Sequence, residues 1–384
     1  MRALPHATVN WSLRLGASSA VAPAAWPSQG WDGCAPVHCA PRFEGRGAWL
    51  LLLALLLGGC ASTAVRRVGE LRKDDAIWLK AGGERVRFVG ELSVPEHLGI
   101  QESGWTRFWR FVSGTQKADA LYRPFAVAVS PHGVVAVTDP GLRSVRRYHP
   151  KDNRHERLQD GLTSPLGVAF VGDVLVVADG VAASLVLFDA AGQRMKLPWK
   201  VPVFSRPTGL AVDAVRQRLF VVDAGAHCVH VISLIGGEPG RVGERGTGEG
   251  QFNFPAHAAV DARGHLYVTD SMNFRVQELD ESFAFVRALG GLGDGPGDLP
   301  RSKGLAVDAR GNLWVVEGAF DVVQGFDVKG ELIAVFGGRG TEAGRLWLPA
   351  GLAIDAAGKL YVADTWNGRV QVFAIEPQPA EKAR

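Results

Sequence analysis

The stretch FNFPAHAAVDARGHLYVTD, residues 252–270, has the pattern of two β-strands joined by a tight turn. A short apolar segment leads into a turn that contains Asp and Gly, and a second β-rich segment ends in an acidic residue. The pattern recurs five times, at residues 123–139, 164–179, 206–223, 301–317 and 348–364. Six copies spaced 41 to 48 residues apart predict a repeat architecture.

Each repeat also contains a third strand, as in FRVQELD (274–280), and most contain a fourth, as in FAFVRALG (283–290). Four antiparallel strands in a repeat of this length are typical of a propeller blade. We therefore expect an all-β fold, a six-bladed β-propeller of four-stranded antiparallel blades. The last repeat lacks a fourth strand, and VRFVGEL (86–92) has no partner of its own. This N-terminal strand is expected to close the ring and remove the exposed edge.

The repeats resemble the NHL repeat, which has a proline, then G-[LV]-A-[VI]-D, G-x-[LI]-[YW]-V-x-D and N-x-R-V-Q. The best matches are residues 253–280, with Asn273 and Arg275, and residues 347–373, with Asn367 and Arg369. The segment IWLKAGGERVRFVGELSVPEHLG (77–99), close before the blades, looks like that of the bacterial six-bladed propeller lipoproteins. That resemblance implies a protein of the bacterial cell envelope.

The apolar run WLLLLALLLGGC (49–60) is too short to span a bilayer and follows Arg42 and Arg46. A basic flank, a short apolar segment and small residues are typical of a signal peptide. Leu57–Cys60 resembles the bacterial lipobox, which implies lipidation of Cys60; the alternative is an ordinary signal peptide with an incidental cysteine. Ala61 after the cysteine, by resemblance to enterobacterial sorting, favours the periplasmic side of the outer membrane.

These features predict four regions. Residues 1–59 form an N-terminal extension and lipoprotein signal peptide, and residues 60–75 form a tether after the lipidated cysteine. Residues 76–377 form the propeller, and residues 378–384 form a C-terminal tail.

One end of the propeller is the candidate binding face, because the inner strands begin there and the second strands end there. His257 occupies a position at this end where the other repeats have Ala or Gly, so it either hydrogen-bonds a ligand or plugs the channel mouth. The motif residues Asn273, Arg275, Asn367 and Arg369 are assigned to the same face. So are Trp105 and Trp109 of GWTRFWRFVSG (104–114), which has helical aromatic spacing. That helix is expected to pack on the propeller; contact with a membrane surface or a partner is the alternative.

Two other groups of residues invite a chemical interpretation. An acidic residue ends the second strand of every repeat, at Asp139, Asp179, Asp223, Asp270, Glu317 and Asp364. A carboxylate ring could suggest calcium, but a residue present in every blade is better explained by hydrogen bonds to turn amides. Cys228 replaces the motif arginine beside His227, and we expect an unpaired thiol rather than a nucleophile.

The balance of 42 basic and 39 acidic residues lacks the basic footprint of nucleic-acid-binding proteins. We expect a monomeric, non-catalytic envelope lipoprotein that acts as a binding scaffold, without metal, cofactor or catalytic residue. It contacts the membrane through its lipid anchor, and its unidentified partner is an envelope component, with a redox protein as one candidate. The alternative is a propeller hydrolase or lyase, gluconolactonase-like or amidating-lyase-like, with a metal in the central channel. The related amidating lyases use several channel histidines, whereas this chain has only His257 at that level.

Overall fold

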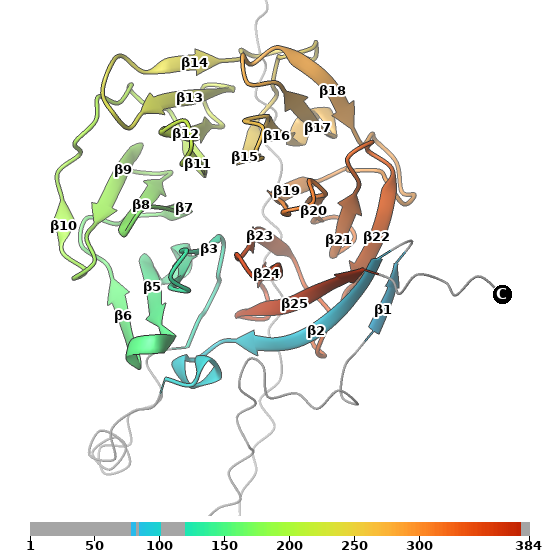
Figure 1. Cartoon of the computed structure of the whole chain (residues 1–384), viewed down its shortest axis with the longest axis horizontal. Helices are drawn as coiled ribbons and strands as arrows, with labels where there is room; N and C mark the ends of the chain where they lie inside the picture. Colours follow the sequence, from blue (N-terminus) through green and yellow to red (C-terminus); the bar gives the residue numbers. More distant parts are fainter. Residues whose placement is uncertain (1–77, 82–83, 101–119, 378–384) are drawn as a thin grey trace, which may run out of the picture. The chain divides into compact units, whose positions relative to one another are not determined.

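The computed structural model describes residues 78–81, 84–100 and 120–377, and shows six β-sheets arranged in a ring (Figure 1). The innermost strands of the six sheets surround a central channel. The expected all-β six-bladed propeller is confirmed. The predicted lipidation site Cys60 and the predicted helix with Trp105 and Trp109 lie outside the described residues. Among the described residues, none of the helical segments could span a lipid bilayer.

Five blades have four antiparallel strands each, ordered from the channel outward in the sequence of the chain. Their strands are as follows: blade 1, β3 (Val127–Val129), β4 (Val135–Asp139), β5 (Ser144–His149) and β6 (Arg154–Leu158); blade 2, β7 (Pro165–Val171), β8 (Val174–Asp179), β9 (Ser184–Phe188) and β10 (Arg194–Met195); blade 3, β11 (Pro207–Asp213), β12 (Arg218–Asp223), β13 (Cys228–Ser233) and β14 (Gly240–Val242); blade 4, β15 (Pro255–Val260), β16 (Leu266–Asp270), β17 (Arg275–Leu279) and β18 (Phe285–Leu289); blade 5, β19 (Ser302–Val307), β20 (Leu313–Glu317), β21 (Val322–Phe326) and β22 (Leu332–Gly337). Short 3₁₀ turns lie at Pro95–Leu98, Pro140–Leu142, Pro150–Asp152 and Ser271–Asn273.

Blade 6 closes the ring with strands from both ends of the described chain (Figure 1). It contains β23 (Pro349–Ile354), β24 (Lys359–Asp364), β25 (Arg369–Pro377), β2 (Glu84–Leu92) and β1 (Trp78–Ala81). β2 pairs antiparallel with β25 along its whole length, which confirms the predicted closing strand. β1 then pairs with β2 as a fifth strand, so this blade is one strand wider than expected.

The repeated glycines at the channel end let neighbouring inner strands pack backbone to backbone. A Cβ atom added at Gly167, Gly209, Gly304 or Gly351 would come within 2.5 to 2.7 Å of backbone atoms of the next blade. Real Cβ atoms essentially never come so close. The small residue at this position is therefore required by ring packing, and His257 is an exception to that requirement.

Candidate binding face at the mouth of the central channel

The two ends of the propeller differ in what they display. One end, called here the loop face, carries the residues just before each inner strand, the connections between second and third strands, and the loops between blades. The opposite end, called the hairpin face, carries the tight turns between first and second strands. All the predicted binding residues that the structure describes come from the loop-face end of their blades.

His257 meets Phe125 across the mouth of the channel. Blades 1 and 4 are opposite one another in the ring of six, as their inner strands β3 and β15 show (Figure 1). The rings of Phe125 and His257 stack with centroids 5.9 Å apart and planes inclined by 27°. The His257 backbone N–H donates to Thr269 Oγ1 at 2.8 Å, which fixes the backbone at this point. Of the two predicted roles for His257, this geometry supports the plug.

The His257 imidazole is neutral at physiological pH. Burial disfavours its charged form, and the nearby positive charge of Lys303 adds to that effect, so its pKa is lowered to about 4. The Lys303 ammonium is half-buried and donates to the Pro349 carbonyl oxygen at 3.2 Å. An uncharged imidazole stacked on phenylalanine therefore closes the mouth, with the Lys303 ammonium nearby.

We expect His257→Ala to fold and to lose an acid sensitivity that the native protein has. A histidine with a lowered pKa in the folded state favours unfolding as the pH falls below the unfolded value of 6.5 towards 4. Between pH 7 and pH 4 the variant should therefore gain up to about 3 kcal/mol relative to the native protein. Urea unfolding of both proteins across that range measures the difference, and a gap that does not change with pH contradicts the assignment. Metal analysis should find no bound metal that depends on His257.

Below the plug lies a cavity of about 260 Å³ that is open towards the hairpin face. All six inner strands line it, and every lining residue is apolar: Val127, Ala128, Val129, Pro131, Val168, Ala169, Phe170, Leu210, Ala211, Val212, Ala258, Ala259, Val260, Ala306, Val307, Leu352, Ala353 and Ile354. Such side chains offer no ligand to a metal ion. Among the residues that the structure describes, no three His, Cys, Asp or Glu side chains are grouped to hold one.

The six carboxylates at the ends of the second strands serve their own blades, as the sequence predicted. Each accepts a backbone N–H from the segment that enters the blade, at 2.6 to 2.9 Å. The donors to Asp139, Asp179, Asp223, Asp270, Glu317 and Asp364 are Tyr122, Thr163, Ser205, Asn253, Arg301 and Trp347, respectively. The carboxylates are buried and bonded to turn amides, which is the structural alternative to a calcium ring.

The motif residues Asn273 and Arg275 hold the loop that enters blade 4. Asn273 donates to the Gly246 carbonyl and to Asp270, each at 2.8 Å. Arg275 donates to Asp270 at 2.9 Å and to the Gly248 carbonyl at 2.6 Å. Their hydrogen bonds order the loop backbone of the face, and direct contact with a partner stays a prediction.

Asn367 and Arg369 repeat this arrangement in blade 6. Asn367 donates to the Gly340 carbonyl at 2.9 Å and to Asp364 at 2.8 Å. Arg369 donates to Asp364 and to Glu91 of the closing strand, each at 2.8 Å. The motif arginine of blade 6 therefore also ties the N-terminal strand to the ring.

Blade 3 has Cys228 in place of the motif arginine, and His230, two residues later, replaces the missing positive charge. Cys228 is a free, fully buried cysteine whose Sγ lies 3.6 Å from His230 Nε2. His230 occupies the position of the motif glutamine, and the same nitrogen lies 3.5 Å from Asp223 Oδ2. Burial disfavours the imidazolium, but the hydrogen bonds to Asp223 and Cys228 outweigh it and raise the pKa of His230 to about 9. The imidazolium therefore supplies the charge that Arg275 and Arg369 supply elsewhere.

We expect His230→Gln to destabilise the propeller in a pH-dependent way. A histidine with a raised folded-state pKa contributes stability that is complete below its unfolded value of 6.5 and lost as the pH rises through 9. The native protein should exceed the variant by up to about 3 kcal/mol at pH 6 and should lose most of that lead by pH 9.5. Urea unfolding at several pH values measures the lead. A lead that persists unchanged at pH 9.5 would show that the role of His230 is packing alone.

The loop face also carries exposed aromatic side chains that are not among the binding residues predicted from the sequence. In the described part of the chain, every Phe, Tyr or Trp that is exposed lies on it: Tyr122, Phe254, Phe320 and Trp366. Trp366 lies beside the half-buried Trp347, with ring centroids 5.7 Å apart. Met272 and Val181 add exposed apolar surface next to the second-strand ends of blades 4 and 2. A pattern in the sequence could have indicated these residues. They recur one to three positions after the blade carboxylates or just before the proline of the inner strand.

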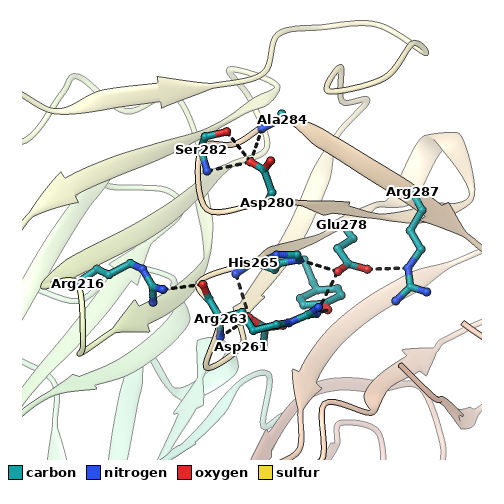
Figure 2. Close-up of polar contacts among 10 residues, drawn as sticks. Arg216, Asp261, Arg263, His265, Glu278, Asp280, Ser282, Ala284 and Arg287 are labelled. Carbon is teal, nitrogen blue, oxygen red and sulfur yellow. Dashed lines mark hydrogen bonds and ion pairs between the residues drawn. The ribbon is translucent and has the colours of Figure 1, made fainter. Parts of the chain in front are cut away.

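A charged network of blade 4 lies towards the hairpin face, and its acidic and basic side chains pair with one another (Figure 2). Glu278 accepts from Arg287 at 2.6 Å, from His265 at 2.8 Å and from Arg263 at 3.3 Å, and Arg263 also pairs with Asp261 at 2.7 Å. Burial opposes ionisation of Glu278, yet these hydrogen bonds hold its pKa below the usual value. The groove of about 480 Å³ beside it, between blades 4 and 5, is lined by Arg263 and Arg310. Both arginines already have acidic partners, Asp261 and Asp308.

The comparisons with known proteins support the fold. The NHL repeat model matches residues 204–232, 252–279 and 346–373, which lie in blades 3, 4 and 6. A search of curated protein sequences finds no significant match.

Similar solved structures share the propeller at low sequence identity. A gluconolactonase from Xanthomonas campestris is 16% identical with a TM-score of 0.53, over 77% of this chain and 91% of that one. An auxiliary nutrient binding protein from Bacteroides thetaiotaomicron is 10% identical with a TM-score of 0.54, over 67% of this chain and 70% of that one. A catalytically inactive virginiamycin B lyase from Staphylococcus aureus with quinupristin is 14% identical with a TM-score of 0.50, over 68% and 97%. Identities this low establish the common fold alone.

Proposed function

Because the chain is a six-bladed β-propeller that carries NHL repeats, its function must be argued from its surface, and we propose that it is a non-catalytic binding scaffold. The loop face is the binding surface, and the partner is another protein of the bacterial envelope. Lipidation of Cys60 would hold the propeller at the membrane, on the periplasmic side of the outer membrane.

The observation that carries this proposal is the gathering of exposed aromatic side chains around a closed channel mouth. Tyr122, Phe254, Phe320 and Trp366 are 40% to 56% exposed and lie at one end of the propeller. Aromatic residues, Met and Arg are enriched in protein interfaces, and Trp, Tyr and Arg dominate their binding energy. A solvent-exposed surface that carries several aromatic side chains in one region is typical of a binding site.

The channel is better suited to a structural core than to metal-dependent catalysis. Its lining side chains are apolar, and the one histidine at its mouth is stacked and neutral. Propellers similar to this one include a nutrient binding protein as well as a gluconolactonase and a lyase, so the shared fold is compatible with either class. The side chains of this chain favour binding.

Site-specific photo-crosslinking in the native host cell tests the proposal. A photoreactive phenylalanine analogue at Phe320 or Met272, on the loop face, should form adducts with one and the same protein. The matched control is the analogue at Val328, which is 53% exposed in a turn of the hairpin face. Equal adducts from both faces, or none from the loop face, would contradict a scaffold that binds through this surface.

A further inference from the structure

Three arginines occupy one structural position on alternate blades of the loop face. Arg123, Arg206 and Arg301 each directly precede the first residue or proline of the inner segment of blades 1, 3 and 5. Each backbone N–H is bound by the carboxylate of its own blade, at 3.1 Å to Asp139, 2.8 Å to Asp223 and 2.9 Å to Glu317. The backbone of all three is therefore fixed, and the arginines are distributed evenly around the channel mouth.

The side chains of these arginines are exposed, and none forms an ion pair with a carboxylate among the described residues. Other charged clusters of the protein differ, since Arg263, Arg275 and Arg369 all pair with an acid. The carboxylates next to these arginines, Asp139, Asp223 and Glu317, are buried and accept backbone N–H groups, including those of the arginines themselves. Lys303 adds another positive charge at the mouth, where it lowers the pKa of His257. The three arginines are thus exposed cations beside Lys303, and exposed acids of the loop face, among them Glu244, Glu249, Asp294 and Glu342, lie in the loops between blades.

The arginine of blade 1 is also combined with the exposed aromatics. The Arg123 guanidinium lies 4.9 Å from the centre of the Trp366 ring and 5.3 Å from that of Tyr122. On the same face, Arg339 lies 4.9 Å from the centre of the Trp347 ring. Stacking on aromatic rings orders a guanidinium while its edge N–H groups stay available for a carboxylate. The aromatic side chains beside it can bury apolar groups of the same ligand.

We propose that the loop face binds an acidic segment of a protein partner, with carboxylates held by Arg123, Arg206 and Arg301 and apolar side chains held by the aromatics between them. This inference rests on the proposed scaffold function and specifies its partner. Arginine with Trp, Tyr, Phe and Met is the composition of a protein interface. An anionic membrane surface is less well matched. The only lysine that the described residues place in this cluster, Lys303, is half-buried, so its ammonium is less accessible to lipid headgroups than the exposed arginines are.

A binding experiment with defined polyanions tests the inference on the full mature protein. The probe is the random copolymer of glutamate and tyrosine, and the comparison probes are a lysine–tyrosine copolymer, phosphatidylglycerol vesicles and polyuridylate. We expect the glutamate–tyrosine copolymer to bind most tightly, and its affinity to fall as NaCl is raised from about 50 to about 300 mM. Arg123→Glu/Arg206→Glu/Arg301→Glu should weaken this binding on the order of a hundredfold.

The matched control makes the same change of charge away from the loop face. Lys151→Glu/Arg194→Glu/Lys329→Glu alters exposed positions in hairpin turns and an outer strand, and should change the affinity less than about threefold. Equal weakening in the two triple variants, or no binding of the copolymer by the native protein, overturns the inference. Tighter arginine-dependent binding of the vesicles or of polyuridylate overturns it as well, in favour of a membrane or nucleic acid. If copolymer binding fails while loop-face crosslinks persist, the acidic-partner inference fails and the scaffold function stands; if the crosslinks are absent too, both fail.

Discussion

Deleting residues 1–92, which removes β1 and β2, is expected to abolish cooperative folding of the propeller. β2 fills the outer position of blade 6, and it pairs with β25 from Glu84 opposite Pro377 to Leu92 opposite Val370. Val86 and Leu92 are completely buried, and Phe88 packs edge-on against Phe373 at 5.9 Å between ring centroids. Loss of a buried Phe, Val or Leu side chain costs about 2 to 5 kcal/mol each. Their sum is about as large as the whole stability of a typical domain.

The measurement is urea unfolding followed by circular dichroism. The matched control is deletion of residues 1–76, which keeps β1 and β2 and should unfold with the same midpoint and slope as the undeleted chain. If the protein lacking residues 1–92 stays soluble and unfolds as sharply as the control, the pairing of β2 with β25 does not contribute to the stability of the ring.

Asp270→Ala is expected to cost about 3 to 5 kcal/mol of folding free energy, the largest effect of a single substitution that we predict. The Asp270 carboxylate accepts from the backbone of Asn253 at 2.6 Å, from Asn273 at 2.8 Å and from Arg275 at 2.9 Å. It also accepts from Gln277 at 3.1 Å. Its removal leaves the half-buried guanidinium of Arg275 without its counter-charge and the loop amide without its acceptor.

A double-mutant cycle separates the ion pair from the other hydrogen bonds. Arg275→Ala alone should be destabilising, and in the Asp270→Ala background it should cost about 1 to 2 kcal/mol less than alone. The measurement is again the free energy of unfolding in urea. Additive effects of the two substitutions would contradict the coupling, and a cost of Asp270→Ala below about 1 kcal/mol would contradict the assigned role of the carboxylate.

The repeat pattern predicts some features of the candidate site and not others. The presence of a carboxylate in every repeat predicts hydrogen bonds to turn amides, and the hydrogen bonds of Asp139, Asp179 and their equivalents confirm this prediction. The replacement of the motif arginine by Cys228 was visible in the sequence, but its compensation by His230 was not. Comparison with the motif shows that the arginine is missing from blade 3. Which neighbouring side chain supplies the positive charge instead depends on side-chain geometry, which the motif does not contain.

The sequence by itself determined the fold of this protein. Strand alternation, turn residues and the blade acids repeat six times, and each repeat encodes hydrogen bonds made within one blade. The unpaired strand before the first repeat also indicated how the ring closes. The last repeat lacks its fourth strand, and the N-terminal strand is available to pair with its third. The stacking of Phe125 on His257 and of Arg123 on Trp366 was decided by the tertiary structure. The repeat places the three arginines and the aromatics at one end of their blades, but it does not predict that Phe125 reaches His257 or that Arg123 reaches Trp366, because closure of the ring brings together side chains from blades far apart in the chain.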